Sequence, residues 1–182
     1  MLQRYLLFLL AVVAASAASL LAQNEGRNST EKHGIAVETD SGRYGVSAEK
    51  LDAKRLGVPI YPGARLDKGE DNQSDASLSL DWGKESTHLY VQKYISSDSP
   101  EKVLSFYRKQ LSKYGPVLEC RDGKPLNSVS VKIKCDSDDD QKGIELKAGT
   151  EEKQHIVGVT SSTAGTEFGL VYLEQTTRTQ VQ

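Results

Sequence analysis

The chain has 182 residues, a formal net charge of −2 and no region in which its 23 Lys and Arg residues form a stripe. Without a basic stripe, or basic residues interleaved with aromatic ones, the composition argues against binding to nucleic acid. Once the N-terminal segment is set aside, roughly 160 residues remain, enough to bury one core, so we expect one domain.

Residues 1–22 have the pattern of a secretory signal peptide. Arg4 supplies a positive start, residues 6–15 are uninterrupted apolar side chains, and an Ala-Ser-Ala run follows. Apolar and small residues continue through Ala22, so an uncleaved anchor, about 17 residues long, stays open as the alternative. We therefore expect an exported protein, periplasmic or secreted, or one anchored to the inner membrane. The polar residues 23–33 predict a linker.

Cys120 and Cys135 are the two cysteines of the chain. An even number in an exported protein favours a disulfide. Alternation within VLEC and VSVKIKC places both sulfurs on the apolar sides of two expected strands. Such a bridge would stabilise the domain by about 3 kcal/mol in the chain-entropy model. The alternative, a zinc or redox pair, lacks both a C-x-x-C spacing and neighbouring histidines.

The first elements of the domain are short. Residues 34–47 alternate weakly around a turn at residues 40–42, which predicts a hairpin, and a helical turn or two should precede Gly57. The segment LGVPIYPGAR, residues 56–65, contains two Pro residues that exclude a helix. We interpret it as a stiff crossover into the sheet, with Ile60 and Tyr61 packed on its edge; a ligand-site rim of Tyr61 and Arg65 is the alternative.

Residues 78–95 predict a β-hairpin. Leu78, Leu80 and Trp82 share one face of the first strand, and the second strand has an aliphatic and an aromatic face. The aliphatic face consists of Leu89, Val91 and Ile95, and we expect it to be core. The aromatic face contains His88, Tyr90 and Tyr94, which with Trp82 form a candidate binding surface for a glycan, peptide or protein. The alternative, which we favour, is that the helix stripe with Tyr107 and Tyr114 covers this face and that both faces are half-buried.

The clearest helix spans residues 99–114. Asp98 or Ser99 can cap it, Pro100 suits its first turn, and Gly115 and Pro116 end it. Its apolar side chains recur at helical spacing and predict a stripe that packs on the sheet. The stripe consists of Val103, Leu104, Tyr107, Leu111 and Tyr114.

Short strands then follow at even spacing, with no helix long enough to connect parallel strands. Residues 168–173 are nearly all apolar and should form a central strand. We predict an α+β fold over residues 34–175: a single antiparallel sheet of about six or seven strands with one principal helix on one face. Residues 176–182 predict a flexible tail.

Several segments match a known family in order: GVPIYPGA, YISSDSPEKVLSFYRKQLSKYGPVLEC, a second cysteine before DSD, LKAGTEEKQHIVGV and GTEFGLVYL. Across roughly Gly34 to Glu174, the chain resembles a family of uncharacterised exported proteins met mostly in Acidobacteria. The resemblance implies export, the paired cysteines Cys120 and Cys135, and one α+β domain. It implies no activity, cofactor or catalytic residue.

No motif predicts catalysis, a metal site or a cofactor. The histidines are His33, His88 and His155, and no G-x-S-x-G signature accompanies them. The acidic run from Asp136 to Asp140 suggests calcium, but Gln141 and Lys147 stand where a calcium loop needs Gly and Glu, so a solvated turn is favoured.

The function expected from the sequence is an exported, non-catalytic module of the cell envelope or periplasm that binds an envelope protein or glycan, or has a structural role. It contacts a membrane only if the N-terminal segment is not cleaved. One alternative is a small secreted hydrolase that uses His88 or His155. Another is the same module tethered by residues 1–22.

Overall fold

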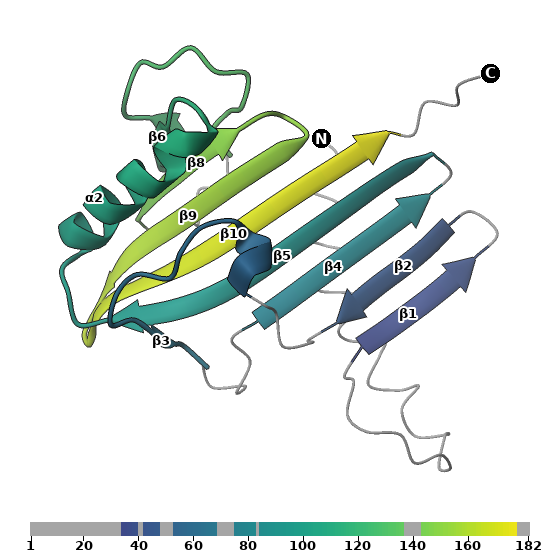
Figure 1. Cartoon of the computed structure of the whole chain (residues 1–182), viewed down its shortest axis with the longest axis horizontal. Helices are drawn as coiled ribbons and strands as arrows, with labels where there is room; N and C mark the ends of the chain where they lie inside the picture. Colours follow the sequence, from purple (N-terminus) through teal and green to yellow (C-terminus); the bar gives the residue numbers. More distant parts are fainter. Residues whose placement is uncertain are drawn as a thin grey trace. The chain divides into compact units, whose positions relative to one another are not determined.

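A computed structural model describes residues 34–39, 42–47, 53–68, 75–82, 84–136 and 143–177 (Figure 1). All of them belong to one compact unit, Lys32–Gln182. The predicted signal peptide or anchor, the linker and residues 178–182 of the predicted tail lie outside these ranges. None of the helices in the described ranges is long and apolar enough to cross a membrane.

The described residues form one antiparallel sheet of ten strands, so the predicted α+β class is confirmed. The strands are β1 (Gly34–Thr39), β2 (Gly42–Ser47), β3 (Arg65–Leu66), β4 (Asp75–Trp82), β5 (Glu85–Ser96), β6 (Leu118–Arg121), β7 (Lys124–Pro125), β8 (Ile144–Gly149), β9 (Lys153–Ser162) and β10 (Gly165–Thr177). Their order is β1-β2-β4-β5-β10-β9-β8-β6-β7, and β3 pairs with β5. The count exceeds our prediction partly because the two-residue strands β3 and β7 are too short to show alternation.

Strand β10 is central, as predicted, since it pairs with β5 on one side and β9 on the other. The predicted first hairpin is also present, because β1 and β2 pair in antiparallel register. Strand β10 continues through Thr177, two residues into the segment that we predicted as a tail. The longest strands, β5 and β10, therefore run side by side through the middle of the sheet (Figure 1).

One face of the sheet carries the helices of the described residues. They are η2 (Ala53–Leu56), α2 (Pro100–Leu111) and η3 (Ser112–Tyr114), so the predicted helix is confirmed with a final 3₁₀ turn. Figure 1 shows α2 beside the β6–β8–β9 end of the sheet. The buried residues of α2 are Val103, Leu104, Tyr107 and Leu111. They pack with Leu146, Val157, Phe168 and Leu170 from the strands in one core cluster. We call this side of the sheet the helix face and the opposite side the open face.

The segment of residues 56–65 leads from η2 to β3, so the predicted crossover is present, but one of its contacts differs. Ile60 is 41% exposed, whereas Tyr61 is buried against α2. Its backbone N–H donates to the Tyr107 hydroxyl over 3.0 Å, and its own hydroxyl donates to Asp98 Oδ2 over 2.8 Å. Tyr61 therefore fixes the position of the helix.

Our assignment of the core side of β5 was wrong. Gln92, Tyr94 and Ser96 are buried on the helix face, while Leu89 and the other predicted core residues are only partly buried on the open face. The period of two correctly separated the faces. It did not indicate which face α2 would cover, because both faces of β5 contain large apolar side chains.

The segment VSVKIKC, residues 129–135, is not a strand. Its alternating side chains nevertheless pack as predicted: Ile133 is buried with Leu118 and Cys120, and Val129 and Val131 lie against them. Strand β6 already pairs with β8 on one side and β7 on the other. Because both of its edges are occupied, the segment covers the open face of this end of the sheet without joining the ladder.

Candidate functional site

The predicted binding surface does not form one exposed patch. Tyr94 is only 2% exposed, donates a 2.8 Å hydrogen bond to Gln92 Oε1 and stacks on Phe168. Burial raises the pKa of Tyr94 to about 12. His88 and Tyr90 are half-buried on the same face, and the side chain of Trp82 lies outside the described residues. Tyr94 thus belongs to the core.

His88 and Tyr90 begin a ladder of stacked rings across three strands. Tyr90, Tyr172 and His155 are direct cross-strand partners on β5, β10 and β9. The centroid separations are 6.5 Å from His88 to Tyr90, 6.3 Å from Tyr90 to Tyr172 and 4.8 Å from Tyr172 to His155. Tyr114 ends the ladder, 3.6 Å from His155. Sequence reasoning grouped His88 with Tyr90 but did not join them to the other rings. Tyr172 and His155 enter the ladder through strand register, and Tyr114 enters it from η3.

Hydrogen bonds join the end of the ladder formed by His155 and Tyr114 to the backbone at and just after η2. The Nδ1–H of His155 donates to the Leu56 carbonyl over 2.9 Å, and the Tyr114 hydroxyl donates to the Gly57 carbonyl. Burial lowers the pKa of His155, partly opposed by the bond to Leu56. His155 is therefore a neutral packing residue that attaches η2 to the sheet.

His88 has a different environment. Its Nδ1 lies 3.1 Å from Ser79 Oγ on β4. Glu174 on β10 is its cross-strand partner, but this carboxylate also forms a 2.8 Å ion pair with Lys153. Hydrogen bonding to Lys153 is the largest cause of the lowered pKa of Glu174, and His88 adds a smaller contribution. Ser79 and His88 thus provide two members of a nucleophile–base arrangement.

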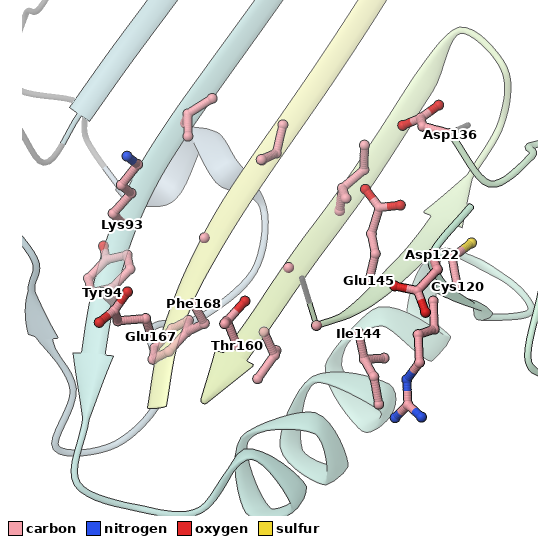
Figure 2. Close-up of a pocket in the computed structure, with 18 of the residues that line it drawn as sticks. Lys93, Tyr94, Cys120, Asp122, Asp136, Ile144, Glu145, Thr160, Glu167 and Phe168 are labelled. Atoms are coloured by element: carbon pink, nitrogen blue, oxygen red, sulfur yellow. The ribbon is translucent and has the colours of Figure 1, made fainter. Parts of the chain in front are cut away.

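The open face contains a groove of about 410 Å³ that sequence reasoning missed (Figure 2). Its floor follows one row of residues in direct register across five strands. The row consists of Lys93, Gly169, Gly158, Glu145 and Cys120. Figure 2 shows Lys93 on one side and Glu145 with Asp122 on the other, separated by β10 and β9. We call this feature the glycine groove.

The two central positions of the floor have no side chain. Gly158 and Gly169 are direct partners on β9 and β10, and a Cβ built on either glycine would meet no atom within 4 Å. Neither has the positive φ that favours glycine. A glycine within a strand often marks the place where a ligand or another backbone approaches closely. Isolated glycines in HIVGVT and EFGLVY were the sequence signal for this floor.

The walls of the glycine groove differ in polarity. Val91, Val171 and Ile156 are register partners that form an aliphatic row beside the glycines. On the opposite side, Glu167 and Thr160 are partners on β10 and β9. All five residues line the groove. A bound molecule would therefore meet aliphatic groups along one side and polar groups along the other.

Carboxylates gather at the β6–β8 end. Glu145, Asp122 and Asp136 line the groove there (Figure 2). Burial raises the pKa of Glu145, although the Lys147 ammonium opposes this shift. The Lys147 side chain is 2% exposed, and its Nζ lies 2.6 Å from Asp136 Oδ2 and 3.4 Å from Glu145 Oε2. Lys147 thus holds two of the carboxylates in place.

The disulfide forms part of the same end of the groove. Cys120 and Cys135 are bonded, as predicted, with their Cα atoms 5.7 Å apart. The groove-lining residues Asp122 and Asp136 lie within two residues of these cysteines. The bond therefore helps to position the acidic rim.

The described residues contain no cluster of three or more His, Cys, Asp or Glu side chains suited to a metal ion. Of the predicted acidic run, Asp136 pairs with Lys147, and Asp138 to Asp140 lie outside the described residues. Comparisons with family models, curated proteins and solved structures found no match.

Proposed function

We propose that this chain is an exported, non-catalytic binding module of the cell envelope or periplasm, and that its ligand occupies the glycine groove. The observation that supports this most strongly is the pair of strand glycines, Gly158 and Gly169, with open space above both. A glycine within a strand lowers the stability of the folded protein by roughly 0.5–1 kcal/mol relative to alanine. Since neither φ nor close packing requires glycine at these positions, access to the backbone is the remaining advantage.

Two observations support export. Residues 1–22 have the pattern of a signal peptide. The Cys120–Cys135 disulfide fits an oxidising compartment, because cytosolic thiols are kept reduced.

The test is a pull-down from envelope extract with wild-type protein and two matched variants. Gly169→Val should narrow the groove at its floor, since a Cβ at this position would meet no atom within 4 Å. Gly45→Ala is the control on β2, where a Cβ would make an ordinary 3.9 Å contact with the Ser79 carbonyl oxygen. We expect a specific protein or glycan that wild type and Gly45→Ala retain and Gly169→Val loses. Equal retention by all three would contradict the proposed site.

A second candidate function is hydrolysis, favoured by the 3.1 Å contact between Ser79 Oγ and His88 Nδ1. With Nδ1 unprotonated, His88 would take the hydroxyl proton as Ser79 attacks a carbonyl carbon. A fluorophosphonate probe tests this chemistry directly. Labelling that disappears in Ser79→Ala and His88→Ala would establish the hydrolase; no labelling of wild type would end that candidate.

A further inference from the structure

We infer that the glycine groove binds an extended polypeptide segment that directs a lysine or arginine toward Glu145, with aliphatic neighbours along Val91, Val171 and Ile156. This inference rests on the proposed function and specifies its ligand. The observations behind it are the length of the floor, the charge of its lining and the aliphatic row.

The floor has the dimensions of a short peptide. From Lys93 on β5 to Glu145 on β8, the row crosses three interstrand spacings, or about 14 Å. A strand advances about 3.3 Å per residue, so roughly four extended residues cover this length. The missing side chains of Gly158 and Gly169 let a peptide backbone approach the sheet at the middle of the row.

The lining favours a cation. It contains five carboxylates but only two basic side chains, Lys93 and Arg121. The carboxylates are Asp67, Asp122, Asp136, Glu145 and Glu167. The balance stays negative when the nearby Lys147 is included. A ligand with a complementary positive charge would associate faster and be selected over an anionic one.

The aliphatic row explains why the cation should belong to a lysine or arginine side chain. Lys and Arg lay their methylene groups along apolar surface while the charged end reaches a polar group. In the groove, Ile156 lies beside Gly158, and Gly158 is the register partner of Glu145. An alkyl stem over Ile156 can therefore bring its charged end to Glu145.

The aromatic residues of the lining give no platform for a sugar. Tyr94 and Phe168 stack on each other within the helix-face core, so their rings are not directed into the groove. The sequence alone allowed either a peptide or a glycan as the ligand. Without an aromatic ring directed into the groove, the lining favours a peptide.

The experiment is an NMR titration of the mature, oxidised, ¹⁵N-labelled protein with acetyl-Val-Leu-Lys-Val-Leu-amide. Two matched peptides replace the lysine with Nε-acetyl-lysine, which keeps the stem without the charge, or with glutamate. We expect the lysine peptide to shift the amide signals of Gly158 and Gly169. The acetylated peptide should bind about tenfold more weakly, the scale of one charge-assisted hydrogen bond.

Variants locate the binding. Gly169→Val should abolish the shifts, and Gly45→Ala should leave them unchanged. The double variant Asp122→Asn with Glu167→Gln keeps side-chain shape at two exposed positions. It should weaken the lysine peptide severalfold and leave the acetylated peptide unaffected.

Each contrary outcome overturns a defined claim. Equal binding of the lysine and acetylated peptides, or tighter binding of the glutamate peptide, overturns the cationic ligand and leaves the groove as a binding site. No shift from any peptide at millimolar concentration overturns the peptide ligand, while a partner lost by Gly169→Val in the pull-down would still support the proposed function. Peptide binding that survives Gly169→Val contradicts the groove itself.

Discussion

Gly158 on β9 and Gly169 on β10 face each other in direct register, and neither position is crowded. Side chains in neighbouring strands ordinarily contact each other and stabilise the sheet. At this pair that contact is absent, on a face where the described residues place no helix. The sheet is therefore open at the place where a ligand can reach its backbone.

The first prediction concerns stability at this pair. Gly169→Ala should raise the free energy of unfolding by about 0.5–1 kcal/mol, because alanine restricts the unfolded chain and its Cβ fits the open space. Urea denaturation measures the change. Gly143→Ala is the control: Gly143 has φ of 120° and a Cβ there would lie 2.2 Å from the Val159 carbonyl oxygen, so we expect destabilisation. A destabilised Gly169→Ala would mean that the fold itself requires this glycine.

A second prediction concerns the buried ammonium of Lys147. Lys147→Met should lower the free energy of unfolding by about 3 kcal/mol, because Glu145 and Asp136 lose their shared cation in a largely buried site. Lys153→Met is the matched surface change. The Lys153 side chain is 60% exposed, and within the described residues its ion-pair partner is Glu174. It should cost less than about 1 kcal/mol. Equal effects in thermal or urea unfolding would show that burial of Lys147 has no special importance.

The third prediction concerns the disulfide. Mass spectrometry of native protein should show Cys120 and Cys135 joined, and reduction should lower the free energy of unfolding by about 3 kcal/mol for a separation of 15 residues. The double variant Cys120→Ala with Cys135→Ala should not respond to reductant. Two free thiols in native material would remove both the bridge and an argument for export.

The fourth prediction concerns pH. The pKa of His155 is lowered mainly by burial, so the unfolded chain takes up a proton at higher pH than the folded protein does. The contribution of His155 to stability should therefore be complete above about pH 6.5 and decline as pH falls through and below that value. The His155 ring signals in NMR should titrate below the ordinary range. In urea unfolding, His155→Phe should reduce the loss of stability between about pH 7 and 5; an unchanged loss would contradict this assignment.

The helix and most long strands could be predicted from the sequence because their signals are local. Pro100 begins α2, and the apolar stripe ending at Leu111 faces the core, as spacing indicates. The paired cysteines were also predictable, although the strand assigned before Cys135 was wrong. An alternating pattern indicates which side chains share a side, but it does not require a free edge to pair with.

The candidate site depended on information that is not local. The alternation in β5 separates Tyr94 from Val91 but does not say which of them α2 will bury. The pairing of Gly158 with Gly169 depends on the register between β9 and β10, which neither strand specifies alone. Tyr90 and His155 likewise meet through Tyr172 only when three strands are aligned.

The disulfide beside the acidic rim can form only in an oxidising compartment, which affects when the groove reaches its final structure. Asp122 and Asp136 lie within two residues of the bonded cysteines, so oxidation of the sulfurs adds a covalent brace to a rim that Lys147 also holds. Cytosolic thiols remain reduced. If the protein is exported as we propose, a newly synthesised copy reaches the translocation machinery before its groove is braced. If the groove also binds basic segments as we infer, it would gain this brace for binding them only on the far side of the membrane.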